Sequence, residues 1–124
     1  MIEFVNKDRL RLAVEALRSG RFVQGTGALE RDGRNCCLGV LCRVAMENGL
    51  DIQAAEKPDG DMAFGERGDT AYLPPEVYTW YGLDVHNMLL STDGNPQESA
   101  TYLNDTWRWT FEMIADAMER TWEL

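Results

Sequence analysis

Three cysteines in one apolar segment are the first residues of this sequence that could do chemistry. Cys36, Cys37 and Cys42 belong to the run RNCCLGVLCRV at residues 34–44, and the one histidine is His86. A thiol in the first turn of a helix has a lowered pKa, so Cys36 or Cys37 with His86 as its base is one hypothesis, a cysteine-dependent enzyme. Because nothing nearby would orient the imidazole, the sequence identifies no catalytic residue.

Metal binding and packing are the other roles open to these cysteines. Zinc sites pair C-x2-C units or add histidines at fixed spacing, whereas adjacent Cys36 and Cys37 point in different directions on a helix. The sequence therefore predicts no metal and no cofactor. Free cysteine is often buried and packs as a small apolar residue. We expect Cys42 to be buried, reduced and inert, and Cys36 and Cys37 to line or underlie a site without acting as nucleophiles.

A ligand-binding site is expected where the cysteine-containing helix begins. Unpaired backbone N–H groups at a helix start, with Arg34 just before them, attract an anion. Gln24 and the loop Gly25–Gly27 are expected beside this point, and Asn104-Asp105 offers polar groups that read a sugar or a base edge. The alternative is an Asx-turn at Asn104 and a solvated Arg34. The predicted binding residues are Gln24, Arg34, Asn35, Cys36, Cys37, Asn104 and Asp105.

Charge is unevenly distributed along the 124 residues, whose net charge is -9. Residues 1–50 carry eight Lys and Arg against six Asp and Glu, and residues 51–124 carry four against fifteen. The acidic second half argues against duplex nucleic acid as a partner, since phosphate binding needs a cationic surface. It also motivates an alternative function, inhibition of a host protein through electrostatic complementarity.

Length and composition predict one domain over residues 1–124, with a mainly α fold and a small β element (α+β). No apolar run is long enough to span a bilayer, and the start lacks the pattern of a secretory signal, so we expect a cytoplasmic protein and no membrane partner. In that reducing compartment the cysteines should be thiols.

Helical periodicity places the elements. Asn6 is expected to cap a first helix that ends before Gly20, and Asn35 to cap a central apolar helix over about residues 36–48 that ends at Gly49. The segment between these helices is predicted to form two short strands or an extended loop, with turns at residues 25–27 and 32–33. Gly39 in the central helix indicates that another group approaches its backbone closely.

The second half contains weaker signals before a clear last helix. A hairpin is predicted around residues 65–68, a short helix in LPPEVYTWYGL, and a loop in STDGNPQES. The last helix has Thr106 or Thr110 as its cap. Its apolar stripe is Trp107, Phe111, Ile114, Ala115, Met118 and Trp122.

Several of these segments resemble a family of small uncharacterised phage and prophage proteins. The shared pieces are ALRSGRFVQGTGALERDGRNCCLGVLC, LPPEVYTWYGL and LNDTWRWTFEMIADAME, of which C-C-L-G-V-L-C is the most specific. The sequence departs from the family pattern at Trp107-Arg108-Trp109, where a glycine-containing turn is expected. The resemblance implies a phage-encoded accessory protein that acts in the bacterial host cytoplasm, where such proteins counter host defence.

The leading hypothesis is a protein that binds and sequesters a small anionic, nucleotide-like molecule without chemistry. It is based on the arginine-rich first half, a helix start and incomplete catalytic parts. Assembly into a homo-oligomer remains open, as does the host-protein inhibitor.

Overall fold

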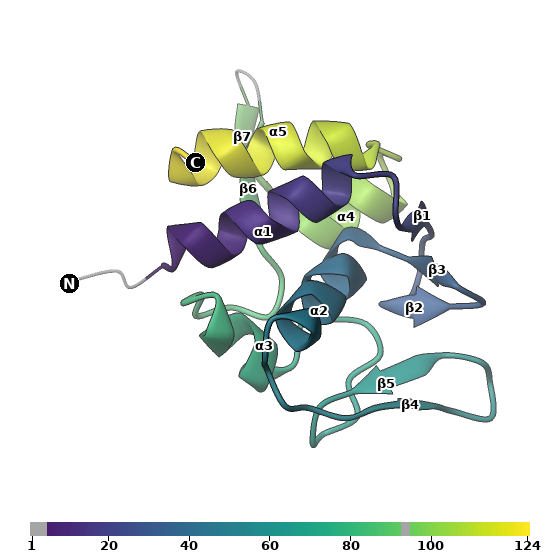
Figure 1. Cartoon of the computed structure of the whole chain (residues 1–124). Coiled ribbons are helices and arrows are strands. Elements are labelled where there is room, and N and C mark those ends of the chain that lie inside the picture. Colours follow the sequence, from purple (N-terminus) through teal and green to yellow (C-terminus); the bar gives the residue numbers. More distant parts are fainter. Residues whose placement is uncertain (1–4, 93–94) are drawn as a thin grey trace.

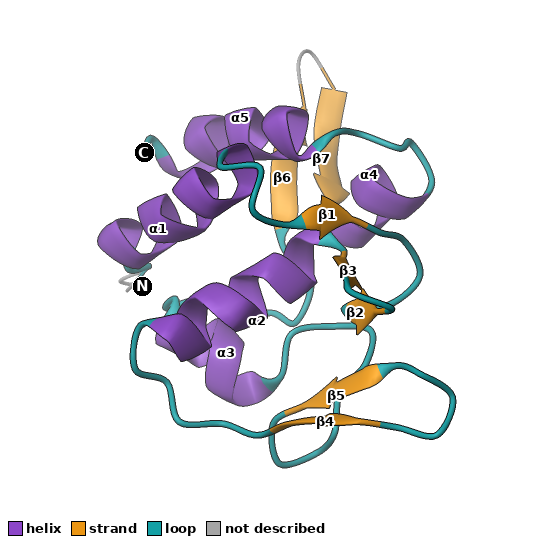
Figure 2. Ribbon diagram, turned by 45° about the vertical axis from the view of Figure 1, so that its right-hand side comes forward, coloured by secondary structure: helices purple, strands orange, loops and turns teal. Residues whose placement is uncertain are grey.

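The computed structural model, which describes residues 5–92 and 95–124, combines five helices with three small β-sheets (Figures 1 and 2). This is the predicted α+β class. In chain order the elements are α1 (Lys7–Arg18), β1 (Val23–Gln24), β2 (Glu30–Arg31), β3 (Arg34–Asn35), α2 (Cys37–Glu47), β4 (Ala54–Glu56), β5 (Met62–Phe64), α3 (Pro75–Trp80), β6 (Leu89–Thr92), β7 (Asn95–Ser99), α4 (Ala100–Asp105) and α5 (Phe111–Trp122).

Helix α2 lies at the centre because it is apolar on nearly every side. Leu38, Leu41 and Cys42 are completely buried, and α1, α3 and α4 all contact the helix (Figure 1). The predicted central helix is thus confirmed. Its predicted cap is wrong, because Asn35 is used in β3, where it pairs with β1 and β2, and Cys36 occupies the N-cap position instead.

Gly39 is the point where α2 meets the chain that precedes it. A Cβ at this position would lie 1.8 Å from the carbonyl oxygen of Leu29. That oxygen accepts the backbone N–H of Cys36 at 3.2 Å, which fixes residues 29–36 against the helix. The close approach inferred from the sequence is therefore made by backbone, and only glycine leaves room for it.

The first helix and the last helix pack side by side (Figure 1). Helix α1 is capped by Asn6, whose side chain accepts the N–H of Arg9, and Gly20 follows it with φ +78°, as predicted. Arg18 at the end of α1 donates to the carboxylates of α5 residues Glu112, Asp116 and Glu119. The first half of the sequence thereby neutralises part of the acidic second half.

The start of the last helix differs from the predicted stripe. Thr110 caps α5 by accepting the N–H of Met113, which settles the choice between the two threonines. Trp107 lies outside the helix and is 46% exposed. A separate short helix, α4, ends at Asp105, and the chain turns at Trp107–Trp109 before α5 begins.

The segment between α1 and α2 forms three strands, where two or a loop were expected. Strand β3 pairs in parallel with β1 and antiparallel with β2, so it is the middle strand. The predicted turn at Asp32-Gly33 joins β2 to β3, with positive φ at both residues. This topology brings the Gln24 end of β1 beside the start of α2.

Two hairpins lie in the second half. Strands β4 and β5 pair with each other, and the predicted turn at residues 65–68 follows, closed by an antiparallel bridge between Phe64 and Asp69. The segment predicted as a loop, STDGNPQES, instead belongs largely to the antiparallel strands β6 and β7. Contact of β6 with α5 explains why this segment forms strands despite its loop-like composition. Residues 93–94 of that segment lie outside the described residues.

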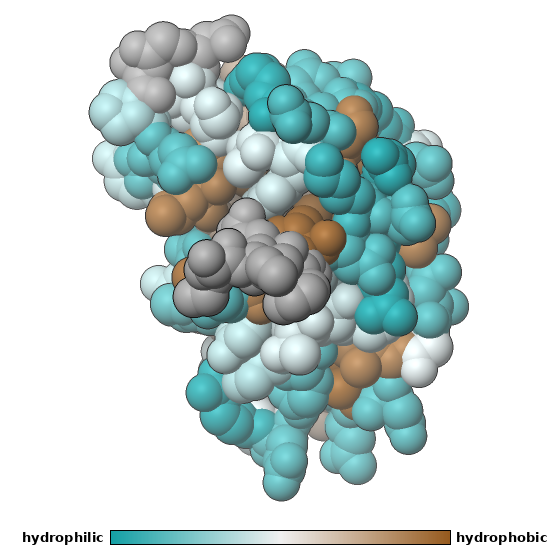
Figure 3. Space-filling view, turned by 90° about the vertical axis from the view of Figure 1, so that its left-hand side faces the viewer, coloured by the Kyte–Doolittle hydropathy of each residue, from teal (hydrophilic) through white to brown (hydrophobic). Residues whose placement is uncertain are grey.

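The surface is largely polar on the face that includes the start of α1. Figure 3 shows this face as mostly hydrophilic, with hydrophobic residues in separate small areas. Within residues 5–92 and 95–124 no helix has both the length and the apolar character needed to cross a membrane.

Candidate functional site

Asn104 connects α4 to the β1 loop and to the start of α2, which are the segments predicted to form one site. Its Oδ1 accepts the side-chain amide of Gln24 at 2.9 Å and the backbone N–H of Cys37 at 3.3 Å. Its Nδ2 donates to the carbonyl of Gly25 at 2.9 Å and to Asp105 at 2.7 Å. These four bonds use the full capacity of the amide, so Asn104, which is 1% exposed, is a structural tie.

The N-terminus of α2 is consequently closed. The N–H of Cys37 is taken by Asn104, and the N–H groups of Leu38 and Gly39 face the Cys36 thiol. Cys36 is 3% exposed and Cys37 is fully buried. The expected seat for an anion at this helix start is therefore occupied by the protein's own groups, and an anion cannot reach it.

The three cysteines are buried, free thiols. Burial raises the pKa of Cys36 to about 11, although the N–H groups at the helix start partly oppose the shift. Burial also raises the pKa of Cys37 and Cys42 well above the ordinary value. At neutral pH these cysteines are therefore protonated, and a thiol is a poor nucleophile.

His86 is exposed on the surface, whereas the three thiols are buried, so its position does not fit a base for them. Its ring packs edge-on against Tyr72 with centroids 4.8 Å apart, and both residues are exposed. In the part of the chain that the structure describes, no cluster of three or more His, Cys, Asp or Glu could hold a metal ion. The third hypothesis, a cysteine-dependent enzyme, receives no support from this geometry.

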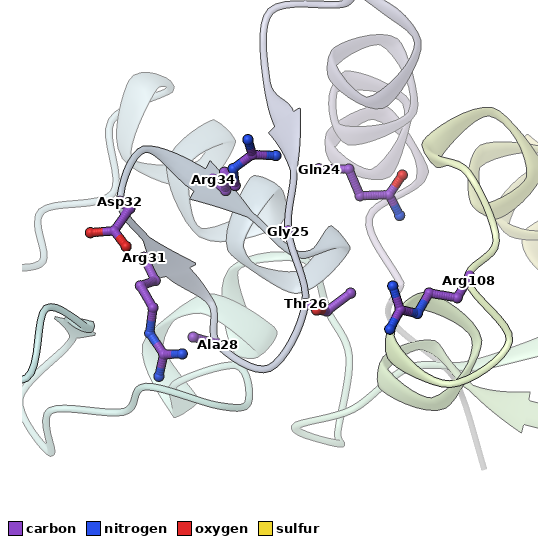
Figure 4. A pocket seen from close by; sticks show the side chains of 8 residues that line it. All are labelled: Gln24, Gly25, Thr26, Ala28, Arg31, Asp32, Arg34 and Arg108. Atoms are coloured by element: carbon purple, nitrogen blue, oxygen red, sulfur yellow. The ribbon is translucent and has the colours of Figure 1, made fainter.

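An open cavity of about 350 Å³ is lined by Gln24 and Gly25, two of the residues that Asn104 holds (Figure 4). This volume is within the usual range of small-molecule sites. The lining residues are Gln24, Gly25, Thr26, Ala28, Arg31, Asp32, Arg34 and Arg108. Three arginines and one aspartate make this cavity locally cationic in a protein of net charge -9.

Arg34 and Arg108 differ from the other arginines. Elsewhere in residues 5–92 and 95–124, every arginine side chain has a carboxylate, a backbone carbonyl or a ring as its partner, whereas these two have no such side-chain contact. Both are exposed, and both line the same cavity. Arg31, the third cation, is already paired with Asp61. Two unpaired guanidinium groups in one cavity are suited to bind an anion.

The strand that carries Arg34 is held against the neighbouring loop by a glycine. A Cβ at Gly25 would lie 2.8 Å from the Cβ of Arg34, so the loop can approach β3 this closely only without a side chain. Gly27 then takes φ +84° and donates its N–H to Asp105 at 3.1 Å. The Q-G-T-G sequence therefore shapes the floor of the cavity.

Side-chain hydrogen bonds of Asn35 in β3 and Glu30 in β2 hold this small sheet to α2. Asn35 is 4% exposed, and its Nδ2 donates to Glu30 at 3.0 Å. Arg43 of α2 donates two further bonds to the same carboxylate, at 2.8 and 2.9 Å. These bonds lower the pKa of Glu30, with Arg43 as the main cause. Asn35 is thus buried in the frame, outside the cavity lining.

Arg108 enters the cavity from the turn between α4 and α5. Its backbone has φ +58°, a left-handed conformation that costs a residue other than glycine about 1–2 kcal/mol. The turn is closed by bonds from Trp107 N–H to Tyr102 O at 3.1 Å and from Trp109 N–H to Leu103 O at 3.0 Å. The glycine-type turn expected here is therefore present, with an arginine in the strained position.

The structure brings the predicted residues together but divides them into two layers. Gln24 and Arg34 line the cavity, while the remaining predicted residues form the buried frame beside it: Asn35, Cys36, Cys37, Asn104 and Asp105. Sequence reasoning missed Arg31, Asp32 and Arg108. For Arg108 a signal existed, since an arginine stands where the turn favours glycine.

Comparison with known proteins places the whole fold in one family. The family model described as "Domain of unknown function (DUF8296)" matches residues 6–122. The chain belongs to this DUF8296 family. No curated protein and no solved structure matches it. Because the match runs from the cap of α1 to the last residue of α5, it includes every residue of the cavity.

Proposed function

We propose that this DUF8296 protein binds and sequesters a small anionic, nucleotide-like molecule in the cavity lined by Gln24, Arg34 and Arg108. The observation that carries the proposal is that both arginines without a side-chain partner in the described residues face one cavity. An exposed arginine of an acidic protein would gain from one of the many carboxylates, yet these two are held apart from them. Their charge is therefore available to a ligand.

The same site supports sequestration without chemistry. The cavity contains no histidine or cysteine, and the buried thiols beneath it are protonated at neutral pH. The side-chain amide of Gln24 donates to Asn104 Oδ1 at 2.9 Å and to the carbonyl of Trp109 at 2.8 Å, so Gln24 positions the loop. We place this activity, from the resemblance described above, in a phage or prophage accessory protein that removes a host signal.

Binding of a panel of phosphorylated probes tests the proposal. Thermal shift and isothermal titration calorimetry would be run with adenosine monophosphate, adenosine 3′,5′-bisphosphate, ADP-ribose and cyclic dinucleotides. At least one probe should bind to the wild type and lose about tenfold or more in affinity in Arg34→Gln, because a charge-assisted bond is lost.

Arg11→Gln is the matched control for this experiment. It removes the same charge from an arginine that lies outside the cavity and pairs with Asp8 on α1. Binding should survive in this variant. Absence of binding to every probe, or equal loss in both variants, would refute the proposal.

A second candidate is inhibition of a host protein, and one observation favours it. Tyr102 and Trp107, in the acidic half, are 43% and 46% exposed and pack edge-on with centroids 5.9 Å apart. Exposed aromatic pairs are common centres of protein interfaces. A pulldown from host lysate with wild type and Trp107→Ala would detect a stoichiometric protein partner that depends on this pair.

A further inference from the structure

The charge inside the cavity is not spread evenly. Arg31 is neutralised by Asp61, and Asp32 adds a negative charge on the same side. Figure 4 shows Arg31, Asp32 and Arg34 on one side of the loop Gly25–Ala28, and Arg108 on the other. The net positive charge of the cavity therefore resides on Arg34 and Arg108.

These two arginines enter the cavity from separate elements. Arg34 is fixed on β3, where Gly25 packs against it, and Arg108 is fixed by the left-handed turn after α4. In Figure 4 their guanidinium groups do not converge on one point, and Gln24 and Thr26 lie between them. Two guanidinium groups that share a single phosphate would point at the same place.

We propose that the ligand carries two phosphate groups set apart across a sugar, one bound by Arg34 and one by Arg108. This inference rests on the proposed function and names its ligand class. A planar guanidinium binds two oxygens of one phosphate side by side, so each arginine satisfies one group. A diphosphate chain, whose two phosphates are adjacent, is the alternative that the probes below test.

Three adenosine nucleotides distinguish this arrangement from a single-phosphate site. Adenosine monophosphate has one phosphate, the diphosphate has two adjacent ones, and adenosine 3′,5′-bisphosphate has two across the ribose. By calorimetry the 3′,5′-bisphosphate should bind about tenfold or more tightly than either of the others. A cyclic dinucleotide, tested alongside, separates a site for two phosphodiesters from one for two terminal phosphates.

Single substitutions assign the two phosphates. In Arg34→Gln or Arg108→Gln, the 3′,5′-bisphosphate should lose its advantage and bind like the monophosphate. Arg11→Gln, which removes the same charge from an arginine outside the cavity that pairs with Asp8, should keep the advantage. Circular dichroism confirms that each variant is folded.

The outcomes separate this inference from the proposed function. Equal affinity of the wild type for the monophosphate and both doubly phosphorylated probes would overturn the two-phosphate inference and leave an anion site in place. Loss of the advantage in Arg11→Gln as well would also overturn it. No binding of any probe would overturn the proposed function itself.

Discussion

Replacement of Arg108 by glycine should make the protein more stable and at the same time remove its ligand binding. The left-handed backbone at φ +58° costs arginine about 1–2 kcal/mol, which glycine does not pay. The greater conformational freedom of glycine in the unfolded chain lowers the free energy of unfolding by about 0.5–1 kcal/mol. At the midpoints of these two ranges the net gain is about 0.75 kcal/mol. For a chain of this length, at about 2.1 cal/mol/K of unfolding entropy per residue, this gain raises Tm by about 2–4 °C.

Arg108→Ala is the matched variant, because it removes the charge and keeps the strain. An alanine at positive φ is as unfavourable as the arginine, so its Tm should not rise. Both variants should lose about tenfold or more of the affinity for adenosine 3′,5′-bisphosphate, since each lacks one charged donor.

Scanning calorimetry and titration calorimetry on the same samples measure the two effects independently. A lower Tm in Arg108→Gly would show that the side chain stabilises the turn and would refute the strain argument. Affinity equal to that of the wild type in both variants would refute the assignment of Arg108 to the ligand.

The remaining predictions concern the frame beneath the cavity. Gly39→Ala should destabilise the fold by about 3 kcal/mol or more, against a helix-propensity gain of about 1 kcal/mol, because its Cβ would overlap the Leu29 carbonyl; urea unfolding with a stability equal to wild type would contradict the packing. Cys42→Ser should cost about 1–3 kcal/mol through burial of an unmatched hydroxyl, and stoichiometric labelling of native Cys42 by a thiol reagent would show that it is not buried. The pKa of Glu30 is lowered from 4.5 mainly by Arg43, so the stabilisation from this pair is complete above about pH 4.5 and is lost as pH falls through the lowered value. Glu30→Gln should therefore be less stable at pH 7 and show a flatter loss of stability below pH 4.5 in acid titrations followed by circular dichroism, and an unchanged acid profile would contradict this account.

Sequence reasoning performed best where short-range rules decide the structure. The helix after Asn6, the apolar helix through the cysteines and the turn at Asp32-Gly33 follow from caps, periodicity and glycine positions, which act within a few residues. It failed where packing selects among weak local preferences. The hairpin of β6 and β7 is stabilised by contact with α5, and Trp107 is excluded from α5 by a turn with an unusual backbone at Arg108.

The apolar central helix, the buried thiols, the largely arginine-based cations and the acidic second half can all be read from composition and local spacing. The sequence also indicated which polar residues gather near the start of that helix. Which of these residues face solvent depends on the tertiary fold. Asn104 fills the helix N-terminus, and Arg18 joins the acidic carboxylates of α5. Arg34 and Arg108, 74 positions apart in the numbering, become neighbours of one cavity. Pairing between distant segments sets which charges are neutralised and which remain available, and no local pattern encodes that choice.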